Sequence, residues 1–201
     1  MDASRITDFA DPAVILPVTA AIFFMLAGAG WRRGAIAWVV AVGCTLCLIL
    51  VLKLRFFACD HVIPEHRIRN PSGHTAAAAV VYGSLGITVV RSVLNVRRWL
   101  IPFTIAIALP IAIAIGISRL QLDQHSMTEV IAGGCVGMVG ALSFVLLAGP
   151  PAPNLSAVRL LVIAVAVIVL LHGLRISIES HLKELAIDIQ EIVPRTSVPV
   201  C

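Results

Sequence analysis

Six apolar runs restrict the fold of this chain more than any other feature of its sequence. They cover residues 13–30, 35–52, 75–90, 99–117, 130–149 and 157–173. A hydrocarbon core about 30 Å thick is crossed by roughly 20 helical residues, with a range of about 17 to 25. Arg159, near the edge of the last run, is the one charged residue inside them, as the cost of desolvating charge in lipid requires. The sequence therefore predicts an all-α polytopic membrane protein, a bundle of six transmembrane helices.

The composition supports this class and argues against a nucleic-acid-binding protein. Hydrophobic residues make up 59% of the chain and charged residues 13%, which is far from the balance of a soluble domain. The net charge of +4 comes from basic residues in short connections between the runs, without the clustered lysines and interleaved aromatics of a nucleic-acid surface. We expect the lipid bilayer as a partner, and no nucleic acid.

The start of the first run favours a retained helix. Asp11 and Pro12 are a typical helix cap and first helical residue. Asp2 and Asp8, with Arg5 as the one basic residue before the run, do not form the basic segment that opens a secretory signal peptide. Six crossings then place both termini on the same side of the membrane.

Polar residues gather in the second and fourth connections, residues 53–70 and 118–129. Counting crossings places both connections on one face, where they can meet. The first, third and fifth connections contain arginines but no histidine or carboxylate. We therefore expect the functional residues on one side only.

The stretch Pro71-Ser72-Gly73-His74 has the properties of a phosphate-binding loop. Pro71 restricts the residue before it to extended backbone, Gly73 permits close approach, and Ser72 can cap the helix that follows. The unpaired N–H groups and positive dipole end of a helix N-terminus bind anions. Lys53 and Arg119 would add positive charge to this site.

His125 and Glu129 are four residues apart, which on a helix places them in contact. A carboxylate that holds one imidazole nitrogen as an N–H donor leaves the other nitrogen with its lone pair free. Such a histidine can form a phosphohistidine intermediate. His74, from the other connection, could protonate the leaving alkoxide and later accept a proton from water.

These residues resemble the signatures of the type 2 phosphatidic acid phosphatase (PAP2) superfamily, K-x6-R-P, P-S-G-H and S-R-x5-H-x3-D. The second signature is intact at Pro71 to His74, and the third is matched by Ser118, Arg119, His125 and Glu129. The resemblance implies a six-helix bundle that needs no metal or other cofactor, with His125 as nucleophile and His74 as general acid and base. By the same resemblance the phosphoryl oxygens are held by a set of residues that comprises Lys53, Ser72, Gly73, Ser118 and Arg119.

The sequence departs from the family pattern at two places. Glu129 stands where the family usually has Asp, so its extra methylene must be accommodated by the backbone or the rotamer. The first signature is damaged, because Asp60 follows Lys53 at the position of the arginine and no Arg-Pro comes after it. Arg69 or Arg67 are the candidates to supply the missing cation, with Arg69 favoured because it is nearer the loop.

The expected substrate is a lipid phosphate or diphosphate, because the site lies at the depth of the headgroups. Two alternatives stay open, a lipid phosphotransferase and a non-catalytic protein that binds or transports an anion. Arginines in the connections opposite the site favour a cytoplasmic location for that face. The sequence therefore predicts a bacterial inner-membrane protein whose active site faces away from the cytoplasm.

Residues 176–193 place apolar side chains on one stripe of a helix, opposite a mainly acidic face. We predict a membrane phosphatase domain over residues 1–175 and a C-terminal amphipathic helix within residues 176–201. Docking of this tail on protein, such as a second subunit of a homo-oligomer, is favoured over a capping helix without a partner. Gly133 and Gly137 form a G-x-x-x-G pattern in the fifth run, for which packing inside the bundle is favoured over dimerisation.

Overall fold

A computed structural model of the chain describes residues 2–58, 70–94, 97–176, 182 and 184–185. Over these residues the chain is helical and contains no strand, as the sequence predicted. The elements are α1 (Ala3–Asp8), α2 (Pro12–Gly28), α3 (Arg32–Ala58), α4 (Gly73–Val93), the short 3-10 helix η1 (Arg97–Trp99), α5 (Leu100–Gln121), α6 (Met127–Ala148) and α7 (Ala157–Leu171).

Each of the six apolar runs forms a helix. Among the described residues, five segments are long and apolar enough to cross a membrane, and α7 is a shorter apolar helix of 15 residues. Several helices extend beyond the predicted runs, so the polar connections are shorter than expected. In particular, Lys53 lies in α3, Arg119 in the last turn of α5 and Glu129 in the first turn of α6. These three polar residues are therefore held on helices and not on loops.

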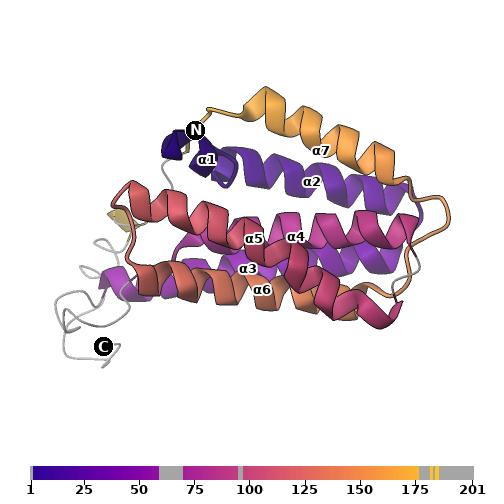
Figure 1. The fold of residues 1–201 in the computed structure, drawn as a ribbon, viewed down its shortest axis with the longest axis horizontal. Coiled ribbons are helices and arrows are strands. Elements are labelled where there is room, and N and C mark those ends of the chain that lie inside the picture. Colours follow the sequence, from indigo (N-terminus) through magenta and orange to yellow (C-terminus); the bar gives the residue numbers. More distant parts are fainter. Residues whose placement is uncertain (1, 59–69, 95–96, 177–181, 183, 186–201) are drawn as a thin grey trace.

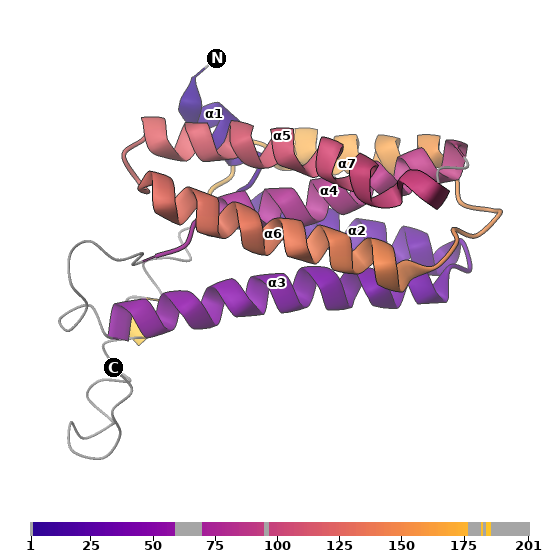
Figure 2. The same ribbon diagram turned by 60° about the horizontal axis from the view of Figure 1, so that its bottom comes forward.

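The helix α4 lies at the centre of the bundle. It contacts α2, α3, α5, α6 and α7, while α2 and α7 pair with each other at one side, an arrangement that Figures 1 and 2 show from two directions. Its buried face begins with Thr75 and continues through a run of four alanines, residues 76–79. Small side chains let neighbouring helices approach closely, and they allow α4 to be surrounded on several sides.

The contact between α4 and α6 is the closest of these approaches. A Cβ atom added at Gly133 would lie within 3.0 Å of the carbonyl oxygen of Ser72, and one added at Gly137 would lie equally close to the carbonyl oxygen of Ala76. The G-x-x-x-G pattern thus packs inside the chain, as favoured above. It holds the first turns of α4 and α6 together, backbone against backbone.

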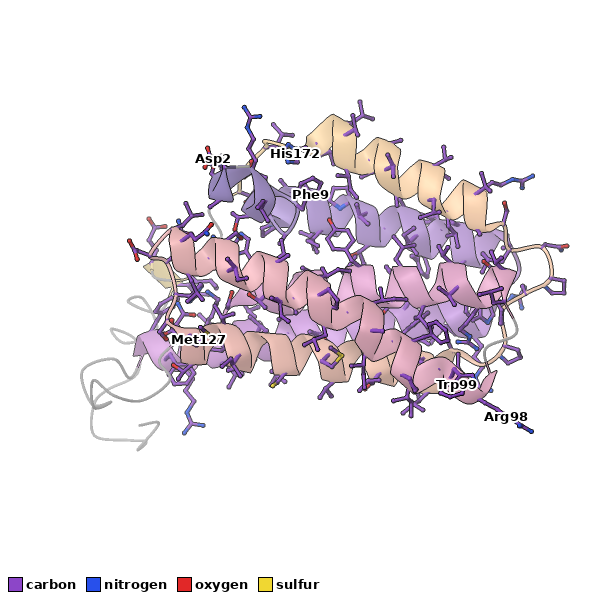
Figure 3. All side chains as sticks on the ribbon, viewed as in Figure 1. Asp2, Phe9, Arg98, Trp99, Met127 and His172 are labelled. Atoms are coloured by element: carbon purple, nitrogen blue, oxygen red, sulfur yellow. The ribbon has the colours of Figure 1, made fainter. Side chains whose placement is uncertain are left out.

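The opposite end of α6 is fixed by side chains that donate to its last carbonyl groups. Trp31 Nε1 donates to Ala148 O at 3.1 Å, Arg33 Nε donates to Leu147 O at 2.8 Å, and Arg91 donates to Gly149 O. Cations are favourable at a helix C-terminus, where carbonyl groups lack helical partners. Figure 3 marks this end of the bundle by Arg98 and Trp99 and the other end by Asp2 and Met127.

The short helix α1 was not predicted from the sequence. Its six residues are too few to show a hydrophobic period, and helices this short depend on tertiary contacts. The turn after α1 packs on α4 and α5, where Ala10, Ala78 and Ile115 form a small buried cluster. Tyr82 Oη donates to Phe9 O at 2.5 Å. These contacts bring the N-terminal residues to the end of the bundle that carries Met127.

The predicted tail helix and its partner surface lie outside the described residues except at Ile176, Leu182, Glu184 and Leu185. Arg67 and Arg69, the candidates for the missing arginine of the first signature, also lie outside them.

Candidate active site

The two polar connections meet at one end of the bundle. Ser72 N donates to the backbone oxygen of Glu129 at 2.9 Å, and Asn70 N donates to Glu129 Oε1 at 3.0 Å. The stretch before α4 and the first turn of α6 are therefore joined directly by hydrogen bonds. The sequence predicted that these segments share one face, and the structure brings them together.

Ser72 caps the N-terminus of α4. Its hydroxyl accepts from Thr75 N at 3.4 Å and lies 2.9 Å from Thr75 Oγ1, and the residue is fully buried. Gly73 follows as the first residue of the helix, where a Cβ atom would contact the side chains of Ile49 and Lys53 at 3.4 to 3.5 Å. The glycine backbone thus lies directly against the stem of Lys53. The start of α4 and the side chain of Lys53 are therefore neighbours.

His125 and Glu129 are in contact, but not through the helical pairing that the sequence suggested. His125 lies in the turn before α6, whose N-cap is Ser126, and Asp123 turns the chain there with a φ of 52°. Glu129 Oε2 accepts from Ser126 N at 3.0 Å and lies 3.1 Å from His125 Nδ1. Glu129 is the third residue of a capping box, and its carboxylate reaches back over the helix start to the imidazole.

The ring of His125 is almost completely enclosed, with 1% of its side chain exposed, whereas His74 keeps 23%. Burial lowers the pKa of His125, the charges of Lys53 and Arg119 act in the same direction, and Glu129 acts against them. The neutral ring is therefore favoured. With Nδ1–H directed at Glu129, Nε2 carries the lone pair.

Lys53 and Arg119 contribute positive charge from α3 and α5. Both are buried, and both lie close enough for their charges to act on His74 as well as on His125. The charge of protonated His125 also acts on His74. These four residues, from three helices and one turn, thus form one electrostatic cluster beside Ser72 and Gly73.

Ser118 is placed differently from the other predicted phosphate-binding residues. Its hydroxyl donates to Ile115 O at 2.7 Å and lies 3.0 Å from Thr7 Oγ1. These contacts connect the end of α5 to α1. The described contacts of Ser118 therefore give it a role in attaching the N-terminal segment.

Asp11 lies at the site, and sequence reasoning treated it only as a helix cap. Its Oδ2 is 4.0 Å from His74 Nε2, and its residue is 6% exposed. Counting crossings had already placed the N-terminus on the same side as the two polar connections. That placement of the N-terminus, and the presence of an acidic residue at the membrane boundary, could have identified Asp11 from the sequence.

Within the described ranges, His, Cys, Asp and Glu form no group of three or more that could hold a metal ion. The site described above consists instead of a helix N-terminus, two cations, two imidazoles and two carboxylates.

Comparisons with known proteins match the region that contains this site. The family model described as the PAP2 superfamily matches residues 53–153. The chain is also 30% identical over 149 residues to an "Uncharacterized 22.5 kDa protein in cps region" from Klebsiella pneumoniae, a match that covers 73% of this chain and 69% of that protein. No solved structure matches the chain.

Proposed function

The chain belongs to the PAP2 superfamily, and on this basis we propose that it hydrolyses a phosphate monoester or diphosphate on a membrane lipid through a phosphohistidine intermediate. Membership supports a phosphatase-type activity in general. The observation that carries the finer proposal is the His125–Glu129 pair at 3.1 Å, joined by hydrogen bonds to the loop that contains Ser72 and His74.

The proposed reaction has two steps. In the first, His125 Nε2 attacks phosphorus, the bond between phosphorus and the lipid oxygen breaks, and His74 gives its proton to that oxygen. In the second, His74 takes a proton from water as the water attacks phosphorus. The N–P bond then breaks, and inorganic phosphate and the original imidazole are released.

The proposed phosphate site comprises the start of α4, Lys53 and Arg119, together with Arg69 or Arg67. The N–H groups at the start of α4 are oriented toward this end of the bundle, and they carry the positive end of the helix dipole. The two buried cations would neutralise the charge that develops on the phosphoryl oxygens. We expect no metal ion or other cofactor to be required.

A membrane lipid is the proposed substrate class because of where the site lies. It is formed where α4 and α6 begin and where α5 ends, and each of these helices is long enough to cross a membrane. A phosphate bound there would lie near the depth of lipid headgroups, with its hydrocarbon chain beside apolar helices.

The test is hydrolysis by the purified protein in detergent, with chelator present, across labelled phosphatidic acid, phosphatidylglycerol phosphate, a polyprenyl diphosphate and lipid A phosphate. We expect free phosphate from at least one of them. Label that appears only on an added lipid or sugar acceptor would indicate a phosphotransferase. Binding of vanadate with no turnover of any substrate would indicate an anion-binding protein, and loss of activity with chelator would indicate a metal mechanism.

The pKa of His125 leads to a pH prediction. A lowered pKa keeps the imidazole neutral and nucleophilic below its ordinary value of 6.5, so the acid limb of kcat/KM should lie below that pH. Glu129 favours the protonated ring, so Glu129→Gln should move the acid limb to still lower pH, while the loss of ring orientation reduces the rate. Both proteins are measured on one substrate, so that the ionisation of the substrate contributes equally to the two pH profiles. The difference between the profiles then reports on the enzyme. An acid limb that moves to higher pH in Glu129→Gln contradicts this assignment.

We also propose that the site faces away from the cytoplasm of a bacterial inner membrane. Arg33 and Arg91 on the opposite face hold carbonyl groups of α6, so the argument from basic loops rests on the exposed Arg32 and Arg98. A reporter that is active only in the cytoplasm, inserted between Pro150 and Asn154 on that opposite face, should give signal. If the same reporter gives signal only when it is placed before α1, the orientation is the opposite of the one proposed.

A further inference from the structure

We propose that Asp11 is a positioning residue for His74. The carboxylate of Asp11 stabilises the charged imidazolium of His74 at the site without binding its proton directly. The proposal rests on the function proposed above in one respect, because it concerns the histidine that donates the proton to the leaving group. Asp11 lies outside all three signatures of the family.

The two carboxylate oxygens of Asp11 have different surroundings. Oδ1 accepts from Ala13 N at 2.9 Å and from Ile176 N at 3.1 Å. Oδ2 lies 4.0 Å from His74 Nε2. Capping of α2 therefore explains one oxygen, and the other oxygen faces the imidazole.

Capping alone does not explain why a charged residue stands at this position. Asparagine and serine cap helices about as well as aspartate, and a buried carboxylate is costly unless it is paired. Asp11 is 6% exposed, and its two hydrogen-bond donors are neutral backbone groups. Arg175 acts on Asp11 through its charge, and protonated His74 opposite Oδ2 would be a second cation that compensates for the carboxylate.

Burial is the largest effect that opposes a positive charge on His74, and three neighbouring groups that are positive or become positive on protonation act in the same direction. Lys53 acts from α3, Arg119 from α5 and His125 from the turn before α6. All three oppose a second positive charge on the imidazole, whereas a general acid must carry its proton before the leaving group departs. A carboxylate within about 4 to 6 Å favours the charged form, and Asp11 provides one from the start of α2.

The distance of 4.0 Å also has a chemical meaning. It exceeds the 2.7 to 3.2 Å typical of an N–H···O hydrogen bond, so Asp11 acts on His74 through its charge. The N–H of the imidazolium then keeps its capacity to donate to a leaving-group oxygen. A shorter contact would compete with the substrate for that proton.

Asp11 is held in place by contacts between the N-terminal segment and the residues that follow α7. Arg175 pairs with Asp8 through Nε to Oδ1 at 2.7 Å and Nη2 to Oδ2 at 3.3 Å, and Ile176 N binds Asp11 itself. Figure 3 shows Phe9 and His172 next to each other at this point, with ring centroids 4.6 Å apart. The segment after α7 thus fixes the turn between α1 and α2 against the site.

The variant that tests this proposal is Asp11→Asn, which keeps the cap and the size but removes the charge. Asp2→Asn is the control, because Asp2 is an exposed aspartate of the same segment that caps α1, and asparagine caps a helix about as well. On an alkyl phosphate lipid, whose leaving group needs the proton, Asp11→Asn should reduce kcat by about 10- to 100-fold. On an aryl phosphate, whose leaving group departs without a proton, the loss should be within about 3-fold, and the basic limb of kcat should move to lower pH only with the alkyl substrate. Asp2→Asn should show neither the substrate dependence nor the moved limb.

A measurement without turnover separates this proposal from the proposed function. In protein labelled with 15N-histidine, with the His74 signal assigned through His74→Gln, the titration midpoint of His74 should move to lower pH in Asp11→Asn and stay unchanged in Asp2→Asn. If this shift is seen in a protein that hydrolyses no lipid phosphate, the pairing holds and the proposed function fails. An unchanged midpoint, or equal losses on both substrates, overturns the role of Asp11.

Discussion

Replacement of His125 by alanine is expected to abolish turnover, with kcat reduced by at least about 1000-fold. The reason is that His125 is the nucleophile of the proposed covalent step, and loss of such a group leaves only the catalysis that binding and electrostatic stabilisation provide. Because the His125 ring is almost fully buried, a thermal unfolding curve must accompany the kinetics. His172→Gln is the matched control, since His172 lies at the same end of the bundle and contacts Arg5 O and the ring of Phe9. It should keep most of the activity.

The covalent intermediate gives the same assignment a second test. With an aryl phosphate the first step does not need the acid, so His74→Gln should accumulate labelled protein because the base for the second step is missing. The label should be lost in acid and survive alkali, as expected of an N–P bond. His125→Ala should take up no label, and label that persists in this variant would place the nucleophile elsewhere.

Gly133→Ala is the second change with a large expected effect. The added methyl group would lie within 3.0 Å of Ser72 O, at the point where α4 and α6 are joined by the hydrogen bond from Ser72 N to Glu129 O. Relief of this clash must separate the proposed phosphate-binding loop from the His125–Glu129 pair. A misplacement of about 1 Å at a reacting centre costs on the order of 100-fold in rate, and overpacking costs typically about 1 to 3 kcal/mol of stability. We expect losses of this size in kcat/KM and in the free energy of unfolding.

The neighbouring glycine is a control for this prediction. A Cβ atom at Gly134 would have its nearest contacts at 3.7 and 3.9 Å, which is ordinary van der Waals distance. Alanine also favours helix relative to glycine, so Gly134→Ala should leave activity and the melting temperature nearly unchanged. Equal effects of the two substitutions would contradict the close contact between α4 and α6 described above.

The positions of the helices were predictable because hydrophobicity alone marks a membrane span. The runs at residues 13–30 and 130–149 became α2 and α6 with small changes at their ends. The end of α3 was misjudged, since it continues through Lys53 to Ala58. Polar residues that emerge from the hydrocarbon region can remain helical, so hydrophobicity does not identify where such a helix ends.

The site could be predicted in part because its residues come in short, fixed spacings. Counting crossings was sufficient to bring Ser72 and Glu129 to the same end of the bundle. The geometry of the His125–Glu129 contact was not predictable, because it depends on a capping box and a turn at Asp123 and not on a helical repeat. Asp11 was missed as a site residue for a related reason. Its approach to His74 depends on α1 and Arg175, whose contacts join residues more than 160 positions apart in the sequence.

The anchoring of α6 at both ends has a consequence for the lipid environment of the protein. Its first turn is bound to Asn70 and Ser72, and its last carbonyl groups are bound to Trp31, Arg33 and Arg91. A thinner or thicker bilayer usually changes the tilt of the helices within it, but a helix fastened in this way has little freedom to tilt. A difference between bilayer thickness and helix length is more easily accommodated by α7, which packs beside α2 at the edge of the bundle. The orientation of Glu129 toward His125 should therefore be the same in membranes that differ in acyl-chain length.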